Sequence, residues 1–443
     1  MDKAKQQFKI DPAKLLLGIA LCFATLLALR NSHNAIDEAL PEIAASSAPV
    51  ASAAPAAMWS DNLTNSLSDV AALHPMDAEI ERFRQRWDIA GISLAVTRND
   101  SLLYAKGYGL ADVERSLPMD ASTTMRLASA SKLITATAIM KLRDEGRLRL
   151  DSHVLGPDGI LADFSDAVTD QRAFSLTIDH LLQHTGGFSA RRGDPLFNTP
   201  DIIESENLTA APTPLELARI VLKRRLAAAP GEMHRYSNFG YFLLSLVIEQ
   251  ISGQSYWDYV KQNVLTPAGA TKFFPAHNYR SECPHWEAAY YGPDTVKIRE
   301  YNGSGRMVDR VYGGNDVHGL LGAGGWTATA SDVARLVAAI DGHPGVPDVI
   351  SPESVALMTE QNDKKQPKQV RGWTSSEGDG RWMRTGTLSS THALVLRFPE
   401  GDCWVLTTNS GVYTGHMFNS KLLQLVNTLR QRYLPEMPRR SLW

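Results

Sequence analysis

The sequence predicts an α+β fold in which one antiparallel sheet is flanked by helices and carries a mostly helical central region. Three observations lead to this prediction. Alternating apolar segments typical of strands lie near both ends of the chain, at about 89–108 and 382–408. Helical periodicity dominates the residues between them. Strand hairpins from the two ends can pair into one sheet, so residues 77–443 are expected to form one unit rather than several domains.

The expected elements follow in chain order. A helix at about 77–86 carries Ile80 and Phe83 at helical spacing, and strands at 89–97 and 102–108 flank a short polar turn. A helix at about 129–145 is apolar through its centre, which indicates burial in a large domain. The remaining expected elements are helices at 178–184, 214–226, 241–251, 256–264, 331–340 and 417–434, a loop at 280–325, and strands at 382–385, 393–398 and 403–408.

The composition is that of an ordinary globular protein. Of the 443 residues, 44% are hydrophobic and 21% are charged, and the net charge of −3 offers no basic footprint for nucleic acid. Only three cysteines are present, none in a CxxC pair, which excludes a disulfide-rich scaffold and the usual zinc knuckles. Cys283 and Cys403 are expected to be packing thiols, with a disulfide between them as the alternative.

The N-terminal residues differ from the rest of the chain. Four lysines among the first 14 residues precede an apolar run at 15–29, which is the pattern of an export signal. The run is short for a full membrane span of about 20 residues. We nevertheless expect residues 1–30 to be an uncleaved anchor with the body of the chain outside, a cleaved signal peptide being the alternative. Residues 31–76 contain an Ala/Ser/Pro-rich stretch and are expected to be a flexible tether.

A Ser-x-x-Lys pair lies at the start of the buried helix. Ser129 and Lys132 are three residues apart, so they share a helix face. The partial positive charge of the helix N-terminus favours a serine alkoxide, and burial favours a neutral lysine. The pair therefore offers a nucleophile with a nearby base. Taken alone, the pattern also fits a helix-capping serine and a surface lysine.

A second motif combines a phenol with an amide in a loop before a helix. Tyr236 and Asn238 follow the Pro230–Gly231 turn. A phenol beside an ammonium group has a lowered pKa, so Tyr236 can shuttle protons, and the Asn238 amide can bond a substrate carbonyl. A buried tyrosine and a helix-capping asparagine are the structural alternatives.

A third motif ends a strand near the C-terminus. It consists of Arg384, Thr385, Gly386 and Thr387. Glycine lets a substrate backbone approach closely, and Arg384 can bind a carboxylate. The amide of Thr387 can pair with that of Ser129 as an oxyanion hole. A strand end with a solvent-facing arginine is the alternative.

In this order, the three motifs resemble those of the serine β-lactamase and penicillin-binding protein superfamily, namely Ser-x-x-Lys, Tyr-x-Asn and Lys-Thr-Gly. The Tyr-x-Asn form is similar to that of the class C β-lactamases and of the DD-peptidases and esterases that share their fold. Leu181–Gly187 and Gly322–Trp326 also resemble segments of this family. The resemblance covers about residues 77–433 and implies that Ser129 is acylated.

The resemblance also implies roles for the other motif residues. Lys132 is the base partner, Tyr236 the proton shuttle and Asn238 the group that orients the acyl chain. The amides of Ser129 and Thr387 hold the oxyanion. Arg384 departs from the lysine of the family, because a guanidinium keeps the charge but cannot donate a proton at ordinary pH. This departure argues against true β-lactamase activity.

The implied function is that of a membrane-tethered, exported serine hydrolase that forms an acyl-enzyme with an amide or ester substrate. Its partners are small-molecule or peptide acyl donors, cell-wall peptides among them, and no cofactor is expected. The oligomeric state stays open. A non-catalytic peptidoglycan- or partner-binding protein that retains the fold is the alternative.

Two other enzyme classes fit the sequence poorly. His180 and His184 are four residues apart on a predicted helix, which suits a metal, but the glutamate of an HExxH motif is missing because position 181 is leucine. No metal is therefore expected there. The absence of a Gly-x-Ser-x-Gly elbow argues against an α/β-hydrolase.

Overall fold

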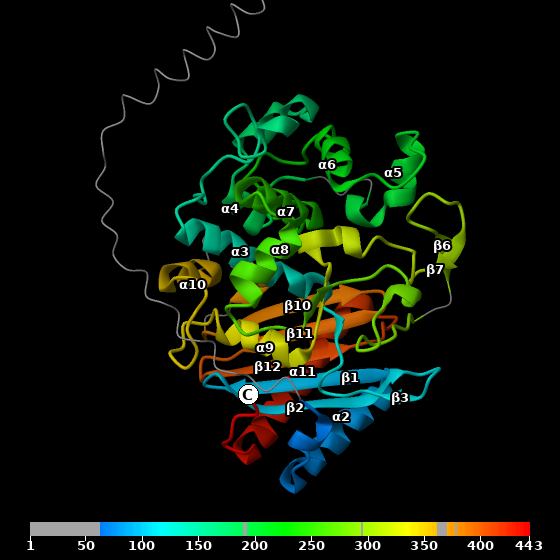
Figure 1. Cartoon of the computed structure of the whole chain (residues 1–443), viewed down its shortest axis with the longest axis vertical. Helices are drawn as coiled ribbons and strands as arrows, with labels where there is room; N and C mark the ends of the chain where they lie inside the picture. The colour runs from blue at the N-terminus through cyan, green and yellow to red at the C-terminus, as the bar shows by residue number, and fades with distance from the viewer. Residues whose placement is uncertain (1–62, 189–192, 294–295, 361–369, 377–378) are drawn as a thin grey trace, which may run out of the picture. The chain divides into compact units, whose positions relative to one another are not determined.

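The structure is a computed structural model of the chain (Figure 1). It describes residues 63–188, 193–293, 296–360, 370–376 and 379–443. The predicted anchor at 1–30 and most of the predicted tether at 31–76 lie outside the described residues. Within the described part, no helix combines the length and the apolar character needed to cross a membrane.

A seven-stranded antiparallel sheet is built from both ends of the chain. Its strand order is β3-β2-β1-β12-β11-β10-β9. The strands are β1 (Gly91–Arg98), β2 (Ser101–Asp112), β3 (Leu117–Pro118), β9 (Ser375–Ser376), β10 (Trp382–Leu388), β11 (Thr391–Arg397) and β12 (Asp402–Thr408). The N-terminal β1 pairs directly with the C-terminal β12, with Leu94 opposite Leu406. This pairing confirms the sheet predicted from the two terminal hairpins.

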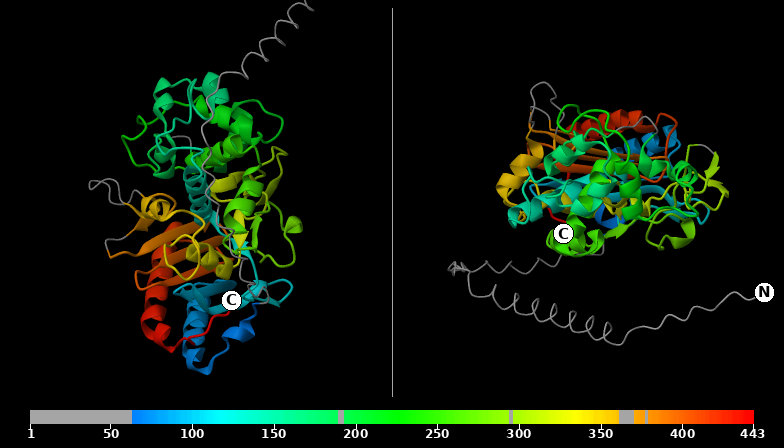
Figure 2. Two further views of the ribbon diagram at one scale, coloured as in Figure 1. Left: turned by 60° about the vertical axis from the view of Figure 1, so that its left-hand side comes forward. Right: turned by 90° about the horizontal axis from the view of Figure 1, so that it is seen from above.

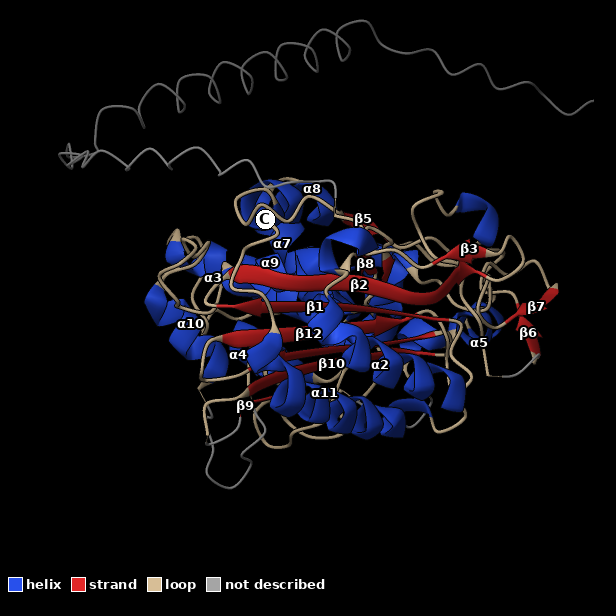
Figure 3. Ribbon diagram, turned by 90° about the horizontal axis from the view of Figure 1, so that it is seen from below, coloured by secondary structure: helices blue, strands red, loops and turns tan. Residues whose placement is uncertain are grey.

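Two helices, one from each end of the chain, cover one face of the sheet. They are α2 (His74–Arg86) and α11 (Asn419–Tyr433), and both lie against this face in Figure 3. Ile80 and Leu422 pack with Leu94 and Trp404 of the sheet in one buried cluster. Because burial of such a side chain stabilises the fold by about 1.5–3 kcal/mol, this layer holds the two ends of the domain together.

The central helices share a larger core with the opposite face of the sheet (Figure 2). Three of them are extensively buried, namely α3 (Ser131–Asp144), α7 (Asn238–Ser252) and α9 (Ala330–Ala338). The other α-helices are α4 (Ile178–Leu182), α5 (Thr199–Ser205), α6 (Pro214–Leu222), α8 (Tyr256–Val260) and α10 (Pro352–Thr359). The α+β class with a mostly helical central region is thus confirmed.

A small second sheet leads the chain into α3. Its order is β4-β8-β5, with the strands β4 (Met125–Arg126), β8 (Trp326–Ala328) and β5 (Phe273–Pro275). The N–H of Leu127 donates to the Trp326 carbonyl at 2.9 Å and continues the pairing. This sheet fixes the backbone immediately before Ser129.

The folded part begins earlier than the sequence predicts. Residues 63–76 were assigned to the tether, yet they contain two 3-10 turns and the start of α2. The side-chain oxygen of Asn65 accepts the N–H groups of Gly107 and Ala121 at 2.8 and 3.0 Å. Leu73 is fully buried. The segment is ordered by these distant partners, which no local pattern reveals.

Other differences are local. The stretch 280–325, predicted as a loop, contains the hairpin of β6 (Lys297–Arg299) and β7 (Met307–Asp309). Strands of three residues are too short for alternation to be visible in a sequence. The helix predicted at 241 begins at Asn238, because the Ser237 hydroxyl caps it by accepting the N–H of Gly240 at 3.1 Å.

Candidate active site

Ser129 lies in a tight turn immediately before α3. The turn is the 3-10 segment Ala128–Ala130, so the α-helix proper starts at Ser131, slightly later than predicted. Ala128 has a left-handed backbone with φ of +49°. A non-glycine residue in this conformation is strained and persists only where its surroundings hold it, which is common at functional sites.

Lys132 is fully buried one turn further along. Its Nζ lies 3.2 Å from Ser129 Oγ, 2.6 Å from Asn238 Oδ1 and 2.5 Å from the Ala323 carbonyl. Burial lowers the pKa of Lys132 to about 8, and it outweighs the opposite effect of Tyr236. An amine with this pKa is available in its neutral form at mildly alkaline pH, as a general base must be.

Tyr236 bridges the serine and the cleft. Its hydroxyl donates to Ser129 Oγ at 2.7 Å, and the Lys132 Nζ lies 4.9 Å from its ring centroid. Burial by itself raises the pKa of Tyr236, but the positive charges of Lys132 and Arg384 outweigh burial and the net shift is downward. The residue is nevertheless 47% exposed, so it lies between the nucleophile and solvent.

Arg384 is buried, and the alternative of a solvent-facing arginine is wrong. Only 2% of its surface is exposed. Its Nε donates to the Ser129 carbonyl at 2.7 Å, and its Nη2 lies 3.4 Å from the Tyr236 hydroxyl. The guanidinium thus supports the backbone of the serine and places a positive charge beside the phenol. It also contributes to the lining of the cleft.

Asn238 lies between two charged groups. Its Oδ1 accepts from Lys132, and its Nδ2 donates to Asp194 Oδ2 at 2.6 Å. The amide therefore positions Lys132, in addition to facing the cleft where an acyl chain can reach it. Asp194 was not among the residues predicted from the sequence. An aspartate directly before a proline is typical of a capping residue, and Asp194 indeed caps the short Pro195–Phe197 turn. This pattern suggests only a structural role.

Gly386 allows β10 to approach the turn that carries the serine. A Cβ atom on Gly386 would lie 2.1 Å from the Leu127 carbonyl oxygen and 3.2 Å from the Ser129 nitrogen. Contacts this short exclude any side chain. Glycine is therefore required here by a close approach between two parts of this chain, whereas the sequence predicted the close approach of a substrate backbone.

The Thr387 amide lies on the side of β10 that points away from β11. The N–H of Thr385 donates to the Thr374 hydroxyl at 3.2 Å, on the side away from β11. Because backbone groups two residues apart on a strand point to the same side, the Thr387 N–H faces this side as well. The amides of Ser129 and Thr387 thus lie on facing segments, as an oxyanion hole requires.

His184 supports the loop that presents Tyr236. Its backbone is left-handed, with φ of +59°, and its Nδ1 accepts the N–H of Ser237 at 3.2 Å. The ring centroids of His184 and Tyr236 are 4.4 Å apart. Burial, together with the charge of Lys132, lowers the pKa of His184 well below its usual value, so the ring is neutral. The His180 side chain completes a capping box with Thr177 at the start of α4.

A cleft of about 360 Å³ opens onto Ser129. Lys132 and Gly386 lie behind its wall, whereas the other predicted site residues line it. The lining residues that sequence reasoning missed come from separate segments, and they include Phe197, Leu320, Thr374, His416 and Asn419. No local pattern connects these side chains, because only the fold brings their segments to one cleft.

Known proteins are similar to the part of the chain that contains the cleft. Residues 77–418 match the family profile described as Beta-lactamase. The chain is 31% identical over 209 residues to Protein flp of Staphylococcus aureus, which is 47% of this chain and only 39% of Flp. It is 28% identical over 312 residues to Esterase EstB of Burkholderia gladioli, covering 67% of this chain and 76% of EstB.

Solved structures share the fold. The octameric penicillin-binding protein homologue from Pyrococcus abyssi superposes with a TM-score of 0.58 at 23% identity, covering 80% of this chain and 77% of that one. The family match extends from α2 to the start of α11 and contains all three predicted motifs. The chain therefore belongs to the beta-lactamase family of serine hydrolases.

Proposed function

We propose that this chain hydrolyses amide or ester donors through an acyl-enzyme on Ser129. The observation that carries the proposal is the hydrogen-bonded set in which both Tyr236 and Lys132 contact Ser129 Oγ. A nucleophile with two basic groups of lowered pKa in direct contact is equipped for covalent catalysis. The class C-like subtype is part of this proposal and is supported by the Tyr-x-Asn motif.

The geometry supports the following acylation step. Ser129 Oγ attacks the donor carbonyl carbon while its proton passes to the Tyr236–Lys132 pair. The negative charge that develops on the carbonyl oxygen is held by the amides of Ser129 and Thr387. The pair then returns the proton to the leaving nitrogen or oxygen, and the bond to the leaving group breaks.

Deacylation uses the same groups, but the proton now comes from water and is passed to Ser129 Oγ. Water attacks the ester carbon of acyl-Ser129, and the Tyr236–Lys132 pair takes its proton. The Ser129 Oγ leaves as the hydroxyl when that proton is returned. Tyr236 is suited to this step because it is the group of the pair that reaches the solvent-open cleft.

The donor class follows from the cleft. Arg384 lines the cleft together with hydroxyl and amide side chains, and its positive charge favours a donor with a free carboxylate, such as a peptide C-terminus. The similarity to EstB supports ester hydrolysis as well. Paired donors that differ only in a free or amidated carboxylate test this preference. Arg384→Ala is expected to slow the charged donor more than the neutral one, and equal losses would contradict the assignment.

Export and membrane attachment are proposed from residues 1–30. Their basic start and apolar run support an uncleaved anchor that leaves the catalytic domain on the outer side. N-terminal sequencing of the mature protein, with fractionation of membranes, tests this. A mature N-terminus near residue 30 in the soluble fraction would show a cleaved signal instead.

Covalent labelling tests the activity itself. Wild-type protein is expected to react with a fluorophosphonate probe, whereas Ser129→Ala should not, and its hydrolysis should fall about 10³-fold or more. Ser131→Ala, two positions away and buried, is the matched control and should still label. An unlabelled but folded wild-type protein would favour the non-catalytic, peptidoglycan- or partner-binding alternative.

A further inference from the structure

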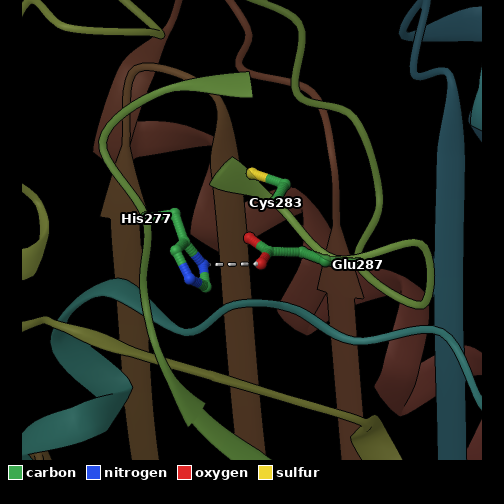
Figure 4. A group of neighbouring side chains, drawn as sticks. All are labelled: His277, Cys283 and Glu287. Carbon is green, nitrogen blue, oxygen red and sulfur yellow. Dashed lines mark hydrogen bonds and ion pairs between the residues drawn. The ribbon is translucent and has the colours of Figure 1, made fainter. Parts of the chain in front are cut away.

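A second cluster of reactive side chains lies apart from the cleft residues, in the loop that follows β5. His277, Cys283 and Glu287 place an imidazole nitrogen, a thiol sulfur and a carboxylate oxygen within 4.8 Å of one another. Figure 4 shows the Glu287 carboxylate between the other two side chains. Cys283 is a free thiol, as is Cys403. The proposed reaction uses none of these groups.

The Glu287 carboxylate is buried, and its ion-pair partner is the His277 imidazole. The Glu287 side chain is 1% exposed. One oxygen accepts from the Tyr290 hydroxyl at 2.7 Å, and the other lies 3.4 Å from His277 Nδ1. The neighbouring Arg126 donates instead to the carbonyls of His277 and Val311, at 2.7 and 3.1 Å. A buried carboxylate is costly unless a cation or several donors compensate its charge.

The distances within the cluster suit a tetrahedral ion. The 3.4 Å between His277 Nδ1 and Glu287 Oε2 is long for a charge-assisted hydrogen bond. Two nitrogen or oxygen ligands of tetrahedral zinc, each bound at about 2.1 Å, lie about 3.4 Å apart. A zinc-bound sulfur lies about 3.6 Å from such a ligand. The Cys283 sulfur lies within 4.8 Å of the other two ligand atoms, and an approach of about 1 Å brings it to this separation.

We propose that His277, Cys283 and Glu287 bind a divalent transition-metal ion, with Zn²⁺ as the best match and water as the fourth ligand. A thiolate and an imidazole select zinc over magnesium or calcium, which prefer oxygen ligands alone. The His277 side chain is 34% exposed, so the ion and its water can reach the site from solvent.

Binding replaces protons with the metal. A thiolate and a neutral imidazole are needed as ligands, so zinc affinity increases with pH. The other charged or titratable groups that face the cluster are Arg126, Glu282, Tyr290 and Tyr312.

The cluster is linked to the segment that carries the nucleophile. Arg126 of β4 holds the His277 carbonyl and lies three positions before Ser129. A metal ion in the cluster therefore stabilises the loop against β4. This predicts a higher melting temperature with zinc, a measurement that does not depend on hydrolase activity.

Metal titration of the full-length chain tests the proposal. Metal-free protein titrated with Zn²⁺ alone is expected to bind one ion per chain, and Co²⁺ should produce a thiolate charge-transfer band. Cys283→Ser should remove this band and weaken zinc binding by about 100-fold or more, since even loss of an outer partner costs 10–100-fold. His285→Ala is the matched control, because His285 lies in the same loop but outside the cluster.

Each outcome of the metal titration either supports or overturns the proposed site. Stoichiometric binding that is lost in Cys283→Ser and kept in His285→Ala supports the site. Absence of the Co²⁺ band in the folded wild-type protein overturns it, whatever the variants do. Equal zinc affinity in wild type and in Cys283→Ser also overturns it. Melting curves recorded without metal show whether each variant is folded.

Discussion

The hydroxyl of Tyr236 lies 2.7 Å from Oγ of Ser129, although 107 positions separate the two residues in the chain. The Lys132 Nζ is farther from the same oxygen, at 3.2 Å, and is held by two other acceptors. The phenol is therefore the group best placed to exchange a proton with the serine. Lys132 is the base partner of the phenol, and its neutral form takes up the proton within the pair.

Removal of this hydroxyl is expected to slow catalysis without weakening binding. Tyr236→Phe keeps the ring against His184 but loses the proton acceptor, so kcat should fall about 10²–10⁴-fold with KM little changed. Steady-state kinetics with an ester donor measure this. Tyr413→Phe is a suitable control, since Tyr413 is 85% exposed. A Tyr236→Phe variant with near-normal kcat would remove Tyr236 from the mechanism.

The rate should rise with pH through an apparent pKa of about 8. Burial lowers the pKa of Lys132 to about 8, and the neutral amine is the active form. Activity is thus low below this pKa, where the amine is charged, and increases as the proton is lost. Because Lys132 and Tyr236 interact, the observed value belongs to the pair. A pH profile of kcat/KM that shows no rise across this range would contradict the assigned base.

The charge of Arg384 is expected to shift this profile. Arg384 lowers the pKa of both Lys132 and Tyr236, so Arg384→Met should move the apparent pKa upward. Arg384→Lys keeps the charge and should leave the profile nearer to that of the wild type. The same kcat/KM profile, recorded for the two variants, separates the effect of charge from that of shape. An unchanged midpoint in Arg384→Met would exclude an electrostatic role.

Asp194 is expected to act in the opposite direction. Its charge raises the pKa of Lys132, and it accepts from the Asn238 amide that holds Lys132. Asp194→Asn should therefore move the apparent pKa downward and lower kcat through misplacement of Asn238. A variant in which only stability changes, with an unmoved profile, would limit Asp194 to its cap on Pro195–Phe197.

Gly386→Ala is expected to disrupt the oxyanion site. The added methyl group would lie 2.1 Å from the Leu127 carbonyl oxygen, so β10 must move away from the serine turn. Loss of one oxyanion donor costs about 10²–10³-fold in kcat, and overpacking about 1–3 kcal/mol in stability. Kinetics and denaturant unfolding measure the two effects. Gly240→Ala is the control, because its methyl group would meet Leu181 at an ordinary 3.6 Å.

Periodicity and spacing were sufficient for the fold class and for the main polar groups. The terminal strands, the buried helix after Ser129 and the Ser129–Lys132 pair are local features, and each depends on neighbours a few positions away. The sequence predicted them because side-chain alternation and helix faces are properties of short segments. Residues 63–73 were missed because they are ordered by contacts with distant parts of the chain.

How these groups act together depends on the packing of distant segments. The sequence places Arg384 at a strand end, and the fold buries it against the Ser129 carbonyl, 255 positions away. The Asn238 amide donates to Asp194, 44 positions earlier in the chain. The proposed zinc site likewise depends on the burial of Glu287. The chemical groups that are present, and their order along the chain, follow from the amino-acid sequence alone. Burial, charge pairing and direction of each side chain were decided by packing, because they arise between elements and not within them.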